Sequence, residues 1–309
     1  MDSMIGRTLP EAGLDTIFKE VDHHETLGTR YPEQLRLFHL QVSNNKFIFT
    51  SLENYLTGII SEYVFSRAQM ERLTDTKSSI NPRSIGIKAL RVMKKNGAAD
   101  QKGTGNELGE ILLYAFLEDV LGAPKLFSKV ELNAASTPFG KESDSIHLLS
   151  LGDESGTTIY ETVFGTSDID GEIENAIDKA FDTIERIENE NGEGISLVAN
   201  QAFEESFDPD VIPRVKNAIV PGPGTPIVSD RAYGVFLGYS LGLDPSTRST
   251  VEFLRDMDRK MEADIRQHAN YITEKIKRLR LETRSFYFYI VPFNDAEVDK
   301  KQVMEDLLM

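Results

Sequence analysis

The sequence predicts an α/β protein built on a central mixed β-sheet flanked by helices. Segments with the spacing of amphipathic helices interleave along the chain with short segments in which apolar and other residues alternate. Residues 143–151 and 157–164 have extended patterns, and the Gly- and Asp-containing segment 152–156 between them suits a β-hairpin. Because a hairpin pairs its strands antiparallel, the sheet is expected to be mixed rather than purely parallel.

Composition limits the classes of protein to which the chain can belong. The 309 residues include 34 Lys and Arg, 50 Asp and Glu and no Cys, so the formal charge is 34 − 50 = −16 and disulfides and thiolate metal sites are excluded. The N-terminus lacks a basic start followed by an apolar run, and no stretch of about 18 apolar residues occurs. We therefore expect a cytoplasmic protein with no membrane segment, and a poor general-purpose binder of nucleic acid.

The charge is spread unevenly along the chain. Residues 168–193 contain ten acidic residues and two basic ones, whereas residues 83–102 and 275–284 are locally basic. Solvated helix faces explain such basic runs in most proteins, and a nucleic-acid groove is the alternative.

The first half of the chain contains two clear helices. Residues 1–30 lack sustained periodicity, and residues 35–49 read as a strand. Ser51 resembles the N-cap of a helix that continues to Val64, and Asn106 can cap a second helix that ends at Gly122. A short helix is expected at residues 87–92 and a strand at residues 126–132.

The second half continues the interleaved pattern. Apolar residues at spacings of 3, 4 and 7 predict a helix over residues 173–187, with the acidic run on its wet face. Further helices are expected at residues 211–218 and 249–281, and extended segments at residues 233–239 and 285–291. Asp295 can cap a last short helix.

Standard signatures of several enzyme classes are absent from the sequence. It contains no G-x-x-x-x-G-K-[ST] loop, no H-E-x-x-H and no G-x-S-x-G, and a cysteine nucleophile is impossible. Carboxylates are the remaining candidates for chemistry.

One set of carboxylates is arranged as a metal site would require. Glu107 or Glu110 lies on a helix, Asp144 starts one strand of the expected hairpin, and Glu161 lies near the end of the other. Antiparallel pairing would make Asp144 and Glu161 neighbours. Carboxylates at one end of a sheet suit Mg²⁺, which takes oxygen ligands together with water and substrate phosphates. The alternative is that these acids cap strands and pair with surface lysines.

The same residues carry a resemblance to known proteins. The order of a helix Glu, a strand, an Asp and a Glu-x-x motif resembles the core of the PD-(D/E)XK nucleases. More narrowly, the segments GNELGEILLYAFLEDVLGAPKLFSKVEL, ESDSIHLL, YETVFGTSD and SFYFYIVPF are similar to the HamA family of Hachiman anti-phage defence systems. The resemblance covers roughly residue 30 to the C-terminus. It implies that Asp144, Glu161 and Glu110, or Glu107 in place of Glu110, hold Mg²⁺ or Mn²⁺.

The resemblance departs from the family pattern at one position. The motif lysine is expected at residue 163, where this chain has Val163, whose aliphatic side chain cannot activate water or stabilise phosphorane charge. A lysine from another element could replace it. Lys129 is the first candidate, and Lys141 and Lys179 are the others. His147 lies three positions after Asp144 and is interpreted as structural.

The resemblance also implies partners and a domain organisation. It implies a nuclease effector that cuts DNA under the control of a helicase partner similar to HamB. The acidic helix then offers a surface for a basic face of that partner. Residues 1–103 are expected to form an N-terminal α/β region packed on a nuclease-like core at residues 104–309, whose C-terminal extension completes the fold. The alternative function is a catalytically inactive nuclease-fold subunit that binds DNA or regulates the helicase.

Overall fold

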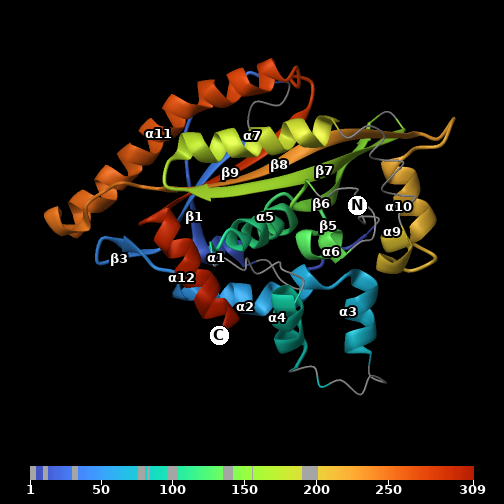
Figure 1. Ribbon diagram of the computed structural model, residues 1–309. Coiled ribbons are helices and arrows are strands. Elements are labelled where there is room, and N and C mark those ends of the chain that lie inside the picture. Colours follow the sequence, from blue (N-terminus) through green and yellow to red (C-terminus); the bar gives the residue numbers. More distant parts are fainter. Residues whose placement is uncertain are drawn as a thin grey trace.

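A seven-stranded mixed sheet with helices on both faces forms the centre of the molecule, which confirms the predicted fold class (Figure 1). The computed structural model describes residues 5–9, 13–29, 34–75, 81, 84–95, 104–134, 142–154, 156–189 and 201–309. The strand order is β1-β2-β9-β8-β7-β6-β5. The strands are β1 (Phe18–Val21), β2 (Leu35–Leu40), β5 (Lys125–Ser128), β6 (Ser145–Glu154), β7 (Thr157–Asp170), β8 (Ile227–Ser240) and β9 (Ser285–Phe293).

The pairing directions follow from the connections between the strands. The four central strands β2, β9, β8 and β7 are parallel to one another, and helices connect β7 to β8 and β8 to β9. β1 and the β6–β5 pair are antiparallel at the two edges, and β6–β7 is the expected hairpin. β1 and β2 come from the first 103 residues, so this region supplies two strands of the same sheet.

Helices cover the sheet unequally on its two faces. The long helices α7 (Ile173–Asn189) and α11 (Thr250–Arg278) cover one face. On the other face α5 (Glu107–Asp119) and α12 (Ala296–Leu308) lie side by side on the sheet, and α2 (Thr50–Val64) packs outside them (Figure 1). The remaining helices are α1 (Leu14–Ile17), α3 (Arg67–Thr74), α4 (Ile85–Lys95), α6 (Lys129–Ala134), α9 (Gln201–Ser206), α10 (Ile212–Ile219) and the 3-10 helix η2 (Pro245–Thr247). No helix in the described ranges is long and apolar enough to cross a membrane.

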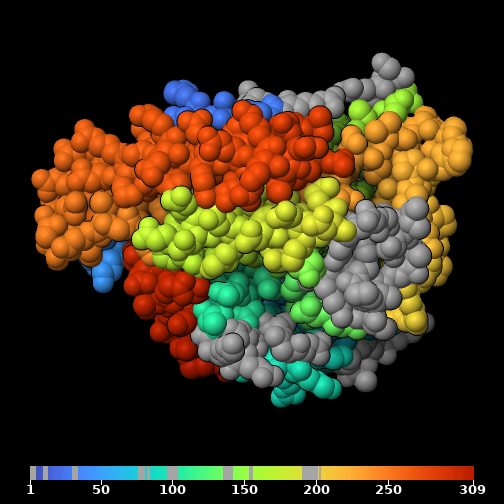
Figure 2. Space-filling model, turned by 45° about the horizontal axis from the view of Figure 1, so that its top comes forward, coloured from blue at the N-terminus to red at the C-terminus, as the bar shows by residue number. Residues whose placement is uncertain are grey.

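The acidic helix α7 packs lengthwise against α11, as Figure 2 shows. Its apolar stripe is buried, as the periodicity predicted. On the side toward α11, the Asp178 carboxylate accepts a hydrogen bond of 2.6 Å from Tyr271 and forms an ion pair with Lys275. Part of the acidic face therefore serves a contact within the chain.

Helix α5 is the central helix on the face of the sheet opposite α7 and α11, and it is buried on nearly all sides. Phe116 stacks on Tyr289 of β9 with ring centroids 4.9 Å apart, and it also contacts the rings of Phe18, Phe38 and Phe236. Burial of this ring attaches α5 to four strands of the sheet and orients its N-terminal end.

Three predicted elements have different boundaries in the structure. The segment 35–49 is not one strand: β2 ends at Leu40, and a small hairpin, β3 (Val42–Ser43) and β4 (Lys46–Phe47), follows because Asn44 and Asn45 adopt positive φ. Helix α2 begins at Thr50, so Ser51 is inside the helix and is not its N-cap.

The predicted strand 126–132 is wrong in its second half. β5 ends at Ser128 and α6 begins at Lys129. Ser128 donates its backbone N–H to the Glu131 carboxylate at 2.9 Å, and its hydroxyl accepts the Glu131 N–H at 3.4 Å. This reciprocal pair is a capping box, whose S-x-x-E signature is readable in the sequence and outweighs the apolar alternation of this segment.

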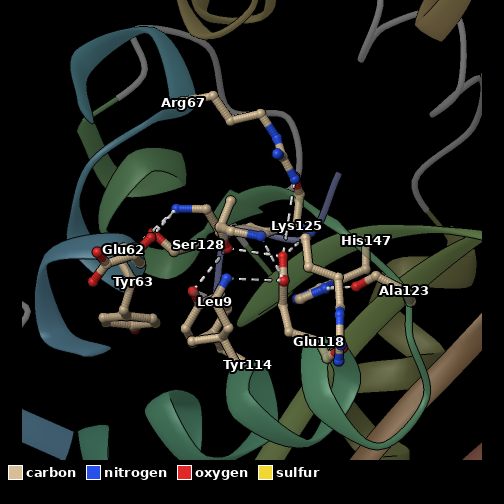
Figure 3. Close-up of polar contacts among 12 residues, drawn as sticks. Leu9, Glu62, Tyr63, Arg67, Tyr114, Glu118, Ala123, Lys125, Ser128 and His147 are labelled. Carbon is tan, nitrogen blue, oxygen red and sulfur yellow. Dashed lines mark hydrogen bonds and ion pairs between the residues drawn. The ribbon is translucent and has the colours of Figure 1, made fainter. Parts of the chain in front are cut away.

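A buried polar network joins α2, α5, β5 and α6 (Figure 3). The fully buried Lys125 ammonium donates to the carbonyl oxygens of Glu62, Tyr63 and Phe65 at 2.6–3.2 Å and forms a 2.8 Å ion pair with Glu131. These carbonyls lie at the C-terminal end of α2, where a cation satisfies acceptors that the helix cannot pair.

Glu118 is the acidic counterpart of Lys125 within this network. Its carboxylate accepts the backbone N–H of Lys125 at 2.6 Å and those of Thr8 and Leu9 at 2.7 and 3.3 Å. Both charged side chains are thus buried with hydrogen-bonding partners, as burial of a charge requires.

Replacing Lys125 with Met is expected to destabilise the fold by about 3–5 kcal/mol, because Glu131 and the α2 carbonyls would lose a buried cation. The free energy of unfolding in urea measures this effect. Lys19→Met is the matched control, since Lys19 is exposed on β1, and it should change stability by less than about 0.5 kcal/mol. Equal effects of the two substitutions would contradict this role for Lys125.

Candidate functional site

Asp144 immediately precedes β6 and is held by the neighbouring strand. Its backbone N–H donates to Gly165 O at 2.8 Å, and its Oδ2 accepts hydrogen bonds from Ser167 N at 2.7 Å and Ser167 Oγ at 2.9 Å. Two donors on one oxygen orient the carboxylate and leave Oδ1 available for other partners. Oδ1 of Asp144 is therefore the oxygen that can interact with the other residues of the site.

Lys129 approaches that free oxygen from the first turn of α6. Its Nζ lies 3.6 Å from Asp144 Oδ1 and donates to Ser143 O at 3.1 Å. The predicted proximity of Lys129 to the hairpin is confirmed, although the residue begins a helix instead of continuing a strand. The capping box at Ser128 and Glu131 turns the chain so that the Lys129 ammonium points to Asp144.

Glu110 enters the site from the first turn of α5. The hydroxyl of the fully buried Tyr63, near the end of α2, donates to Glu110 Oε2 at 3.0 Å. Glu107 is also buried on the same helix, and its charge contributes less than that of Asp144 to the environment of Glu110. Of the two candidates, Glu110 is thus the one to which Tyr63 donates a hydrogen bond, and the charge of Asp144 acts on it.

The two carboxylates perturb one another electrostatically. Burial, followed by the negative charge of Asp144, raises the pKa of Glu110 to about 8. Burial also raises the pKa of Asp144, and the Lys129 ammonium and the Ser167 donors offset part of that increase. A carboxylate pair that resists double ionisation is a favourable place for an added cation, and perturbed pKa values of this kind are typical of functional sites.

Glu161 does not lie beside Asp144, so the expectation that they are neighbours is wrong. Both hairpin strands extend farther than predicted, and the register pairs Glu161 with Leu149, whereas Asp144 lies next to Gly165. Leu149 is five residues along β6 from Asp144, so about 16 Å of strand separates Glu161 from the level of Asp144. The Glu161 carboxylate accepts hydrogen bonds from Ser285 and Tyr287 of β9 instead, at 2.5 and 2.6 Å.

Small residues occupy the β7 positions at the level of Asp144. A Cβ at Gly165 would collide with Ser145 Oγ and the side chain of Leu113, so no larger side chain fits there. Ser167, the next residue on the same face, is bound to Asp144. Val163 is fully buried opposite His147, which agrees with the aliphatic character of that position.

The other candidate residues lie elsewhere. Lys179 on α7 pairs with Asp168 and Asp170 at 3.3 and 2.7 Å. Lys141 lies outside the described residues. His147 is fully buried, its Nδ1 lies 2.8 Å from Ala123 O, and burial lowers its pKa to about 3. His147 therefore has the structural environment that was predicted for it.

Sequence reasoning missed two residues of the site. Tyr63 belongs to the apolar stripe of α2, and its ring packs in the hydrophobic core. Ser167 lies in a strand extension beyond the predicted end at residue 164. Neither residue belongs to a local sequence motif, because each orients a carboxylate that is distant from it in the sequence.

The carboxylates of the candidate site offer two ligands to a metal ion, Glu110 and Asp144. Within the described part of the chain, no group of three or more His, Asp or Glu side chains is placed to hold a metal ion. Glu110 and Asp144 nevertheless provide two hard oxygen donors, and Mg²⁺ commonly binds one or two carboxylates and completes its shell with water and substrate phosphates. These two residues fit such an ion, whereas Glu161 is turned toward β9.

Comparison with known proteins identifies one family. The family model HamA matches residues 15–307, nearly the whole chain. A search of curated proteins and a search of solved structures find no match.

The raised pKa of Glu110 predicts a pH-dependent stability. In the folded protein the Glu110 carboxyl keeps its proton up to about pH 8, whereas in the unfolded chain it ionises near its ordinary pKa of 4.5. Because the unfolded chain binds fewer protons between these two pKa values, the free energy of unfolding decreases as the pH rises through this range. Glu110→Gln cannot lose a proton. It should therefore gain stability relative to the unmodified chain as the pH increases from about 5 to about 8.5.

Urea unfolding at several pH values in chelator-containing buffer measures this difference. Glu174→Gln, at an exposed carboxylate on α7, is the control and should show no such trend. A constant difference between Glu110→Gln and the unmodified chain would disprove the assignment.

Proposed function

The chain belongs to the HamA family, and we propose that it is the nuclease effector of a two-component Hachiman anti-phage defence system. Family membership fits a component of such a system. The proposed activity is hydrolysis of DNA phosphodiester bonds with Mg²⁺ or Mn²⁺, under the control of a HamB-like helicase, on a PD-(D/E)XK-like core. The observation that carries the proposal is the convergence of Asp144, Glu110 and Lys129, from three separate elements, at one end of the sheet.

Each residue has a role in the proposed reaction. Asp144 and Glu110 would hold the divalent ion, which supplies charge neutralisation at the phosphate and activation of water when bound. Ser167 and Tyr63 orient these two carboxylates. The Lys129 ammonium would stabilise the negative charge that develops on the phosphorane, the role of the motif lysine that Val163 cannot fill.

A second candidate function is supported by the β7 strand. The β7 positions at the level of Asp144 are Gly165 and Ser167, and Glu161 is bound to β9. Strand β7, which carries the Glu-x-x motif, thus contributes no carboxylate to the site. Such a nuclease-like fold would suit an inactive subunit that binds DNA or regulates the helicase.

Asp144→Asn and Lys129→Met are expected to reduce cleavage of supercoiled plasmid in Mg²⁺ by about 100-fold or more. The assay uses the chain in complex with its helicase partner and ATP. Asp258→Asn, at an exposed position on α11, serves as the matched control and should cleave normally. Absence of cleavage by the unmodified complex, with DNA binding retained, would favour the inactive-subunit alternative.

Glu161→Gln is expected to retain cleavage within about threefold, because Glu161 lies about 16 Å along the strand from the level of Asp144. The same plasmid assay measures this effect, and the melting temperature reports any loss of the hydrogen bonds to Ser285 and Tyr287. Loss of cleavage by a folded Glu161→Gln variant would restore Glu161 to the metal site and contradict the arrangement proposed here.

The acidic face of α7 remains the proposed surface for the helicase. Charge reversal at the exposed residues Glu174, Asp182 and Glu185 should weaken the complex at low salt and have little effect at high salt, since exposed charges are screened. Asp178 is left unchanged because it pairs with Lys275. Titration of the partner at two salt concentrations measures the effect, and an unchanged affinity would exclude this surface.

A further inference from the structure

Helix α4 carries a stripe of cations on its exposed side. The helix has four basic residues and no acidic one. Lys88, Arg91 and Lys95 are exposed and have the i, i+3, i+7 spacing that places side chains on one face. No ion pair between described residues involves these three side chains. Lys94 points elsewhere and donates to Leu308 O at 2.5 Å.

The stripe borders a groove of about 400 Å³ between α3, α4, α6 and α9. Val92, one turn after Lys88, lines this groove, and Lys88 Nζ lies 5.8 Å from the ring centroid of Phe65, another lining residue. Arg72 of α3 adds a further cation to the wall. The cationic stripe and the groove therefore form one continuous surface.

The acids in the groove are already engaged with other groups. Glu131 forms its ion pair with the buried Lys125, and Glu205 accepts a hydrogen bond from Gln201. Glu205 keeps its negative charge, but Arg72 and the three cations of the stripe outnumber it, although the whole chain carries −16. Seven residues of helix separate Lys88 from Lys95, about 10 Å, a length that spans about three phosphates on one DNA strand.

The groove and the candidate site are built on the same two segments of the chain. Phe65, which lines the groove, follows Tyr63, which binds Glu110, by two residues. Val130 and Glu131, which also line it, follow Lys129, which contacts Asp144. The end of α2 and the start of α6 therefore contribute residues to both.

We infer that the stripe of Lys88, Arg91 and Lys95, with the adjoining groove, binds the phosphate backbone of the DNA that reaches the site. This inference rests on the proposed nuclease function for its substrate, but binding can be measured without cleavage. The class of ligand is a phosphodiester chain, because three spaced cations recognise repeated negative charge without a requirement for base sequence.

Fluorescence anisotropy with labelled 20-nucleotide single-stranded and duplex DNA, in chelator-containing buffer, tests the inference. The Lys88→Glu, Arg91→Glu, Lys95→Glu variant should lose at least about tenfold in affinity at low salt. Its slope of log affinity against log salt should decrease by about 2 to 3, since each lost phosphate contact contributes about 0.7 to 0.9.

The matched control reverses Arg255, Arg259 and Arg266 on α11, which lies across the sheet from α4 (Figure 1). It makes the same change in net charge and disrupts exposed ion pairs of little energetic value. It should bind DNA as the unmodified chain does. A second variant with Gln at the three α4 positions separates loss of cations from added repulsion, and melting temperatures verify folding.

Several outcomes would overturn the inference. These are no DNA binding by the unmodified chain, equal losses in the α4 and α11 variants, or unchanged DNA affinity in the α4 variant accompanied by weaker binding of the helicase partner. DNA binding through α4 without cleavage in the complete complex would instead overturn the proposed nuclease function and leave this inference standing.

Discussion

The ammonium group of Lys125 holds three segments of the chain together in the interior, and both sides of the candidate site are attached to these segments. It binds carbonyls at the end of α2, next to Tyr63, and it pairs with Glu131 in the first turn of α6, next to Lys129. Its own backbone is held by Glu118 of α5, the helix that carries Glu110. Pairing of the buried Lys125 charge with these acceptors favours one arrangement of the three segments, because a buried unpaired charge is costly.

A second constraint is the close approach of α5 to β7. A Cβ at Gly109 would lie 3.1 Å from Ser167 Oγ, and one at Gly165 would collide with Leu113 of the helix, so small residues on both elements let the helix lie close to the strand. This approach brings the N-terminal end of α5 to the start of β6, where Glu110 and Asp144 interact. The same packing leaves no room for an acid on the strand at that level. The site is consequently assembled from a helix, a loop and a short helix.

The fold class, the hairpin and the long helices were predictable because their signals are local. The stripe of α7 and the Asp295 cap of α12 are confirmed, since periodicity and capping chemistry act over a few residues. The strand predicted at residues 126–132 ends early because a capping box competes with apolar alternation. Glu161 was placed beside Asp144 because hairpin register depends on turn length and strand ends, and the sequence pattern did not show that β6 continues to Glu154 and β7 to Asp170.

The sequence by itself determined the α/β class, the absence of cysteine chemistry, the resemblance to HamA and the importance of Asp144, Glu110 and Lys129 as candidates. Only the tertiary structure decided which of these side chains meet. It separated Glu161 from the group, added Tyr63 and Ser167, and placed the basic stripe of α4 beside a groove lined by sequence neighbours of Tyr63 and Lys129. The physical reason is that helix and strand periodicity depends on neighbouring residues, whereas strand register, buried ion pairs and the close approach of a helix to a sheet depend on residues distant in the chain.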